Sequence, residues 1–429
     1  MGPGGEAMEA KSLRHLAAGL GILTVTALGL YSVSGEDPRP ATEFERERSL
    51  FESELAPLER IAFDPPATEE TRLQLLSRLH QKASLTERDE DYRRLNLALA
   101  RVWEREGPTP ELCLLRATLE FRMHRLSEAR RVLGLLPGLS RTRKGASLEA
   151  SIAFEEGRMD EAVRGGREVL ERFRSWDALA RLAGFEAKRG RDSEAERLYE
   201  EAEGEITSKE MRAYAWVELQ RGRLALERGR YDEADRRYQE ASRAYSGYFL
   251  TYEYLAELRG AQGRFEEAVA LYERAVAQNP RPETQQALGD LHAFMGRPDL
   301  ARPWHEKAID GYLASVGSGE IRYLHHLAGY YADVSGQASE AVACARRDCE
   351  LRRNGSTREA LAWAEFRSGH FEAAELEIRS AIDSGLVSVH LYQHAGMILL
   401  GAGRTEEGRS CLAKADALNP RNKDFHAHR

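Results

Sequence analysis

Two histidines separated by four positions are the best candidate for metal binding in the sequence. His390 and His394 would lie on one face of a helix, and His426 and His428 near the C-terminus could join them. Imidazole nitrogens are common zinc ligands, but two histidines alone bind zinc weakly. We therefore interpret the pair as surface or groove residues, and we expect neither a metal ion nor a cofactor.

Residues that could form a catalytic centre are otherwise scarce. The sequence has no phosphate-binding glycine loop followed by Lys and Ser or Thr, no His-Glu-x-x-His and no Gly-x-Ser-x-Gly. We therefore predict that the protein is not an enzyme. The alternative is an enzyme, or an accessory subunit of an enzyme or transport complex, whose site uses His326, Tyr330, Asp333 and Trp363. Activity screening with and without His326→Ala distinguishes the two.

The cysteines do not indicate a metal site or a disulfide framework. Cys113, Cys344, Cys349 and Cys411 are spaced too widely for either. Cys344 and Cys349 are five residues apart on one predicted helix, which separates them by a rise of roughly 7.5 Å and turns their side chains in different directions. We expect free, partly buried thiols.

Composition favours long helices over a single globular core. Of the 429 residues, 31% are charged and 8% are aromatic, a mixture typical of solvated helices with thin apolar faces. A chain of this length forms either several domains or one extended repeat array. The net charge of −8, with both signs interspersed, argues against nucleic acid as a partner.

An internal repeat runs through most of the chain. Its clearest unit, residues 249–280, places Gly263 between two helical segments and Ala268 and Tyr272 on the second. Corresponding glycines recur mostly 33 or 34 residues apart, and His124 takes the glycine position of one unit. These glycines are Gly157, Gly190, Gly229, Gly263, Gly296, Gly336, Gly369 and Gly403. Two longer intervals predict extended helices or loops near residues 204–210 and 314–319.

This pattern of glycines, alanines and aromatic residues resembles the tetratricopeptide repeat family. The resemblance implies an all-α fold, a right-handed superhelical solenoid of about nine helix-turn-helix repeats. In such an array, Ala268 lies where two helices cross closely, and Gly263 takes the left-handed conformation that ends the first helix. One hairpin cannot bury its apolar face alone, so stacking of neighbouring hairpins forms the core.

Members of that family hold partner polypeptides in a concave groove lined by the first helix of each hairpin. Carried over by position, the groove has an acidic middle and an aromatic C-terminal half, which suits a peptide with basic and apolar anchors. The expected groove residues are Trp216, Arg223, Glu253, Tyr254, Glu257, Asp290, Tyr323, His326, Tyr330, Trp363 and Met397. We therefore predict a non-catalytic protein–protein interaction scaffold whose partner is another polypeptide.

The N-terminal segment predicts export. Residues 16–33 are almost uncharged, and Lys11 and Arg14 precede them. An apolar run of roughly 18 residues is close to the minimum for a membrane span and slightly long for the core of a signal peptide. Because the positive charge would stay in the cytoplasm, we expect the repeats outside it. The repeats are membrane-anchored if the segment is retained, and secreted or periplasmic if it is cleaved.

The chain divides into five segments on this interpretation. They are an export signal or membrane anchor at 1–37, a linker and amphipathic helix at 38–68, a degenerate N-terminal repeat or cap at 69–109, the repeat array at 110–420 and a C-terminal tail at 421–429. No solvating helix is predicted after the last repeat. An alternative function is therefore a homo-oligomerising structural module, in which that repeat stacks on a second copy and light scattering detects a concentration-dependent dimer.

Overall fold

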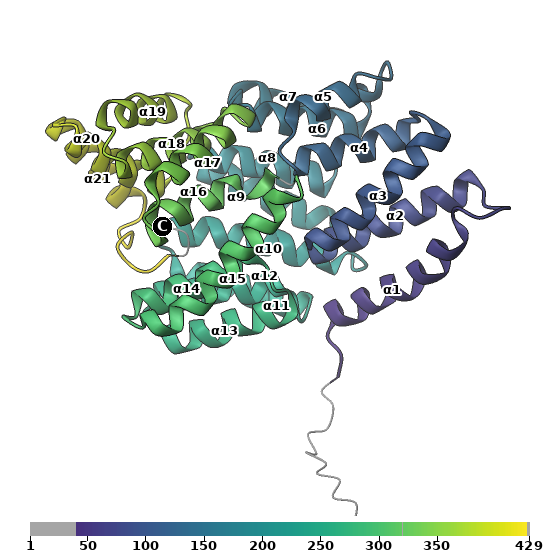
Figure 1. The fold of residues 1–429 in the computed structure, drawn as a ribbon, viewed down its shortest axis with the longest axis horizontal. Coiled ribbons are helices and arrows are strands. Elements are labelled where there is room, and N and C mark those ends of the chain that lie inside the picture. Colours follow the sequence, from purple (N-terminus) through teal and green to yellow (C-terminus); the bar gives the residue numbers. More distant parts are fainter. Residues whose placement is uncertain (1–39, 320, 427–429) are drawn as a thin grey trace, which may run out of the picture. The chain divides into compact units, whose positions relative to one another are not determined.

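The structure, a computed structural model, describes residues 40–319 and 321–426, and the chain divides into two units, residues 1–40 and 41–429. Within the described residues every regular element is a helix (Figure 1). None of these helices is long and apolar enough to cross a bilayer. The predicted export segment, residues 16–33, lies outside the described residues.

The helices of the second unit pair into antiparallel hairpins. Three helices come first: α1 (Glu43–Ile61), α2 (Glu69–Thr86) and α3 (Asp89–Glu106). The following described helices form nine hairpins: α4 (Pro110–Arg122) with α5 (Leu126–Leu133), α6 (Arg143–Glu155) with α7 (Met159–Arg172), α8 (Trp176–Lys188) with α9 (Asp192–Glu205), α10 (Met211–Glu227) with α11 (Tyr231–Ala244), α12 (Phe249–Ala261) with α13 (Phe265–Gln278), α14 (Pro282–Phe294) with α15 (Pro298–Gly317), α16 (Leu324–Gly329) with α17 (Ala338–Leu351), α18 (Gly355–Arg367) with α19 (Phe371–Asp383), and α20 (Val389–Gly401) with α21 (Thr405–Leu418). The predicted all-α solenoid is confirmed.

The two long intervals in the repeat have different structural causes. Near residue 204 a loop follows α9, and the next helix, α10, is 17 residues long. Near residue 314 the helix itself is extended, since α15 has 20 residues. A short 3-10 helix, η2 (Ile321–Tyr323), and a π-helical turn, η3 (Tyr330–Val334), then flank α16. A 3-10 helix, η1 (Leu139–Arg141), also precedes α6.

Left-handed residues end the first helix of each hairpin. The eight repeat glycines have φ between 66° and 80°, and His124 at the ninth position has φ 59°. This conformation costs a residue with a side chain roughly 1–2 kcal/mol, which explains why glycine recurs at these turns. The predicted role of Gly263 is confirmed.

Small residues at the helix crossings allow close packing. Ala268 on α13 is fully buried beside Ala256, Tyr272 and Leu288. We expect Ala268→Leu to lower the free energy of unfolding by about 1–3 kcal/mol, because a well-packed core has no space for three further carbons. Urea denaturation measures this loss. Ala270→Leu, at an exposed position on the same helix, is the control, and equal effects of the two changes would contradict the packing.

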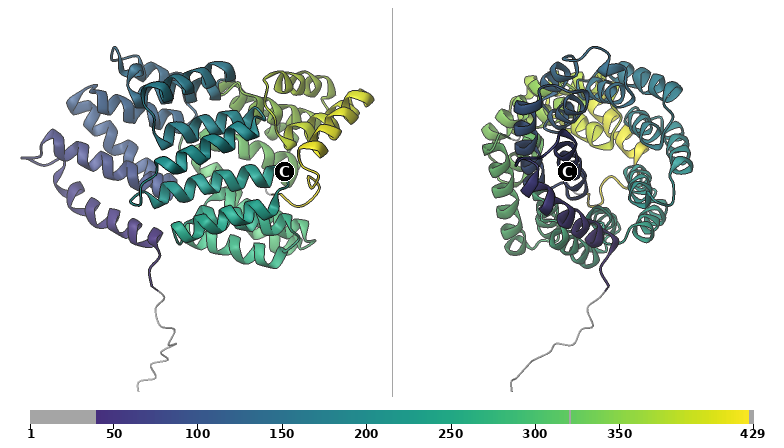
Figure 2. Two further views of the ribbon diagram at one scale, coloured as in Figure 1. Left: turned by 180° about the vertical axis from the view of Figure 1, so that it is seen from behind. Right: turned by 90° about the vertical axis from the view of Figure 1, so that its right-hand side faces the viewer.

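Successive turns of the superhelix touch one another. The hairpins wind about a common axis, so segments 193, 199 or 203 residues apart in sequence lie side by side (Figure 2). The linkers at Ser246, Asn279 and Asn354 each join two hairpins. They contact Glu43 at the start of α1, Thr86 at the end of α2 and Glu155 at the end of α6, respectively. The Asn354 Nδ2 group donates a hydrogen bond to the Glu155 carbonyl (3.2 Å), and the Val387 N–H donates to the Lys188 carbonyl (2.9 Å).

Three repeat glycines lie directly under these contacts. A Cβ atom at Gly157 would lie 2.4 Å from the Arg353 carbonyl oxygen, and one at Gly229 would lie 2.4 Å from the Asn419 Oδ1 atom. At Gly190 it would meet the Val387 side chain at 3.0 Å. At Gly263, Gly296, Gly336, Gly369 and Gly403 no described atom beyond the glycine and its two chain neighbours lies within 4 Å of such a Cβ. Glycine at the first three positions therefore serves both the hairpin turn and the contact between superhelical turns.

The last described residues fold back onto the preceding superhelical turn. Phe425 is buried against Gly260 and Phe294, and the Tyr231 hydroxyl donates a hydrogen bond to Asp424 (3.3 Å). The Gln393 amide donates to the Asn422 carbonyl (2.9 Å). Residues 419–426 thus connect the last hairpin to α10–α14, a docking that we did not predict for the C-terminal tail.

Candidate functional site

A cavity of about 1170 Å³ lies on the concave side of the described hairpins. Its lining comes mainly from the first helices of successive hairpins, α10, α12, α14, α16, α18 and α20, together with the start of α15 and residues 419–426. Charged, histidine and aromatic side chains share this lining. The cavity is therefore a candidate binding site on the described hairpins.

Six of the eleven predicted groove residues line the cavity. They are Arg223, Glu257, Asp290, His326, Tyr330 and Trp363. All except His326 come from the row six residues before a repeat glycine, so this rule located cavity-facing positions in five consecutive hairpins. The four residues of the hypothetical enzyme site, His326, Tyr330, Asp333 and Trp363, also share this cavity.

The other five lie outside the cavity lining. Trp216 packs against the apolar cluster of α6–α10, and Tyr254 stacks on Tyr238 with ring centroids 5.7 Å apart. Glu253 accepts a hydrogen bond from Thr284 (3.3 Å). Tyr323 is only 2% exposed and packs against Tyr312, whereas Met397, 45% exposed, follows the cavity-lining part of α20. Sequence position alone did not separate these side chains from those that reach the cavity.

The charge of the predicted acidic middle depends on its surroundings. Burial, reinforced by Glu227 and Glu253, raises the pKa of Glu257 to about 8. Burial also acts to raise the pKa of Glu227, but Lys188 and Arg223 outweigh it and lower that pKa. At neutral pH the negative charge in this part of the cavity is therefore carried by Glu227, which lies between two cations, and Glu257 is mostly protonated.

The raised pKa of Glu257 gives a pH-dependent stability. The native protein keeps a proton on Glu257 that the unfolded chain loses above pH about 4.5, so this group's contribution to stability falls as pH rises from about 4.5 to 8. We expect Glu257→Gln to stabilise the protein at pH 9 relative to the wild type by on the order of 1 kcal/mol, with little change at pH 5. Thermal melting at the two pH values measures the difference.

Glu306→Gln is the matched control, because Glu306 lies on the same cavity but is exposed. Burial also raises the pKa of Glu218 to about 8, so part of the pH dependence persists in the variant. An equal effect at pH 5 and pH 9 would contradict the assignment to Glu257.

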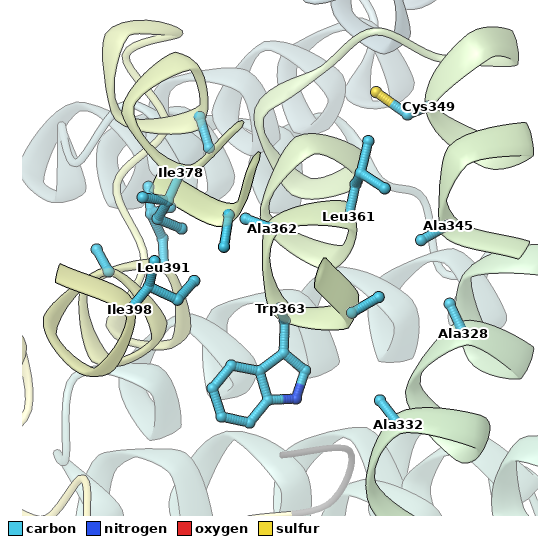
Figure 3. Close-up of a cluster of buried hydrophobic side chains, with 14 of the residues drawn as sticks. Ala328, Ala332, Ala345, Cys349, Leu361, Ala362, Trp363, Ile378, Leu391 and Ile398 are labelled. Atoms are coloured by element: carbon cyan, nitrogen blue, oxygen red, sulfur yellow. The ribbon is translucent and has the colours of Figure 1, made fainter. Parts of the chain in front are cut away.

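Trp363 of α18 and Asp333 of η3 line the cavity side by side. The Trp363 Nε1–H group donates to both Asp333 oxygens (3.1 and 3.0 Å). Burial raises the pKa of Asp333, and the hydrogen bond from Trp363 partly opposes this. Trp363 lies at the edge of the apolar cluster of α16–α21, and its ring points away from Ile378 (Figure 3). Tyr330 begins the π-helical turn, a feature that often occurs at functional sites.

Two histidines and a carboxylate converge between α18 and α20. The Nδ1 atoms of His390 and His394 lie 3.2 and 3.1 Å from the same Glu359 Oε1 atom. Burial acts to raise the pKa of Glu359, but the hydrogen bonds from the two histidines outweigh it, and the pKa is lowered. The His394 ring stacks on Trp363, with centroids 4.1 Å apart and an interplanar angle of 6°.

The histidine spacing predicted one shared face on α20, but Glu359 was missed. Glu359 is 31 residues before His390, on the first helix of the preceding hairpin, and an acidic residue about one repeat earlier is the only sequence signal of its proximity. His426 lines the same cavity. His428 lies outside the described residues. Lys188, Glu227 and residues 419–425 were also not predicted as part of the site.

Comparison with known proteins identifies two stretches of the chain as tetratricopeptide repeats, residues 247–314 and residues 389–422. No curated protein sequence matches the chain. Among solved structures, it is similar to the APC/C hetero-tetramer Cut9-Hcn1, with 12% identity, a TM-score of 0.40 and coverage of 90% of this chain and 95% of that one.

Two further structures are similar over shorter parts of this chain. For MamA the identity is 18% and the TM-score 0.32, with coverage of 39% of this chain and 96% of that one. For a tetratricopeptide repeat protein from Parabacteroides merdae the values are 20% and 0.35, with 57% and 93% coverage. The two sequence matches, the described helical hairpins and their left-handed turn residues show that the chain contains tetratricopeptide repeats.

Proposed function

We propose that this protein is a non-catalytic scaffold that holds a partner polypeptide in the cavity on the concave side of its hairpins. Tetratricopeptide repeats support a role in protein–protein interaction. The observation that carries the proposal is that this surface already binds polypeptide, since residues 419–426 of the chain itself lie against the cavity. Phe425 packs between Gly260 and Phe294, and Gln393 donates to the backbone of Asn422.

These contacts indicate the chemistry of a suitable partner. The Gln393 side-chain amide binds the backbone carbonyl of Asn422, which lies outside any helix. The Phe294 ring contacts Phe425, which serves as an apolar anchor. Asp290 in the lining supplies an acceptor for a basic residue, whereas the charge of Glu227 is already compensated by Lys188 and Arg223. The proposed partner is therefore an irregular or extended segment that carries an apolar or aromatic anchor and a basic residue.

A photo-crosslinking amino acid tests where the partner binds. We expect p-benzoylphenylalanine in place of Phe294, which lines the cavity, to crosslink a polypeptide in cells. The same replacement at Phe371, an exposed aromatic residue on α19 outside the cavity lining, should not do so. Mass spectrometry identifies the product. Equal crosslinking at both positions, or crosslinking at Phe371 alone, would contradict binding in the cavity.

We also propose that the repeats function outside the cytoplasm. The support is the apolar stretch at residues 16–33 with Lys11 and Arg14 before it, because flanking positive charge holds that end in the cytoplasm. A reporter protein that works only in an exported compartment should be active when it is fused after Arg429. Deletion of residues 16–33 should abolish this activity, and an unchanged signal would refute the proposed location.

A further inference from the structure

We infer that Glu359, His390 and His394 form a binding site for a divalent zinc-type cation that opens onto the cavity. The three side chains come from two consecutive hairpins, one from α18 and two from α20. Their candidate ligand atoms all lie within 4.8 Å of one another. Two imidazoles and one carboxylate are a common protein ligand set for zinc.

Two of the three spacings between the candidate ligand atoms are close to those of a tetrahedral site. Zinc bonds to nitrogen and oxygen of about 2.0–2.2 Å require neighbouring ligand atoms to be roughly 3.3–3.5 Å apart. The two distances from Glu359 Oε1 to the histidine Nδ1 atoms are 3.2 and 3.1 Å.

The charge at this position also suits a cation. Glu359 is only 7% exposed, and a buried carboxylate needs a compensating charge. Among the described residues its ion-pair partners within 4 Å are His390 and His394, which are cationic only when protonated. A divalent ion bound by the three side chains compensates the carboxylate while both imidazoles remain neutral ligands.

The surroundings hold one ligand in place and leave access to the ion. The His394 ring stacks on Trp363, and Asp333 fixes that indole by accepting its N–H. Such supporting contacts orient metal ligands and affect affinity. All three ligands line the cavity, so an ion bound by them would border the space proposed for the partner. The ion would then bind water or a donor atom from the partner.

Zinc titration of the full chain, purified without a polyhistidine tag and stripped with a chelator, tests the site. Competition with a chromogenic zinc indicator should reveal one saturable site. Glu359→Gln and His394→Gln should each lower its affinity at least tenfold, as expected for loss of one of three ligands. His370→Gln should change it less than twofold, because His370 pairs with Glu365 and is not one of the three proposed ligands.

Circular dichroism must show that the variants are folded, and bound Co²⁺ provides a second measurement. The wild-type protein should give the visible absorption of nitrogen-coordinated Co²⁺, and His390→Gln should reduce it. Equal zinc affinity of the wild type and the Glu359→Gln and His394→Gln variants would overturn the inference, as would the absence of saturable binding. The test uses no partner, so its failure leaves the proposed scaffold function unaffected.

Discussion

Gly157→Ala should lower the free energy of unfolding by about 2–5 kcal/mol, whereas Gly263→Ala should lower it by only about 1–2 kcal/mol. Both glycines are left-handed, with φ of 78° and 73°, so the backbone cost is the same for both. Only at Gly157 would the new Cβ atom meet the next superhelical turn, 2.4 Å from the Arg353 carbonyl oxygen. The difference between the two variants therefore measures the contact between turns.

Urea denaturation gives the two values, and hydrogen exchange locates the effect. In Gly157→Ala the amides of residues 352–358 should exchange faster, because the linker before α18 loses its support on α6. In Gly263→Ala they should exchange at the wild-type rate. Equal loss of stability in the two variants, with no change at residues 352–358, would show that the superhelical turns do not touch in solution.

Trp363→Ala and Tyr330→Ala should each weaken binding of the partner more than tenfold. Both rings line the cavity on successive hairpins, and loss of an aromatic anchor typically costs about 2 kcal/mol or more of binding free energy. Calorimetric titration with the partner that the crosslinking experiment identifies measures the affinity. Because Trp363 also packs on the cluster of α16–α21, thermal melting must accompany each measurement.

Arg409→Ala is the control on the outer surface. Arg409 lies on α21, the second helix of its hairpin, its side chain is 71% exposed and it is not part of the cavity lining. We expect this variant to bind normally. Normal binding by a folded Trp363→Ala protein would reject the cavity as the site, and an equal loss in Arg409→Ala would place the partner on the convex face.

The features that could be predicted from the sequence are local ones. A glycine in a left-handed turn and an alanine at a helix crossing each depend on neighbours within one hairpin, so they recur with the repeat. Arg223, Glu257, Asp290, Tyr330 and Trp363 follow from the same period and line the cavity. Periodicity therefore sufficed for the hairpins and for one row of the site.

The features that the sequence did not predict connect distant residues. The linker at Asn354 contacts Glu155, 199 residues away, and no local pattern marks either residue for that role. Phe425 packs on Gly260 of α12 and on Phe294 of α14, and the sequence around residue 425 does not indicate either contact. Met397 obeys the same positional rule as Trp363, but only the first part of α20 reaches the cavity. Curvature of the whole array, which single repeats do not encode, decides these contacts.

Contact between the superhelical turns restricts the route by which a partner enters. In an open solenoid, a loop of a folded protein can slide sideways between two turns. Here linkers at residues 279, 354 and 387 are hydrogen-bonded to residues 86, 155 and 188 of the preceding turn. We therefore expect a partner to enter along the axis, and a segment with a free end should associate faster than the same segment held at both ends in a folded protein.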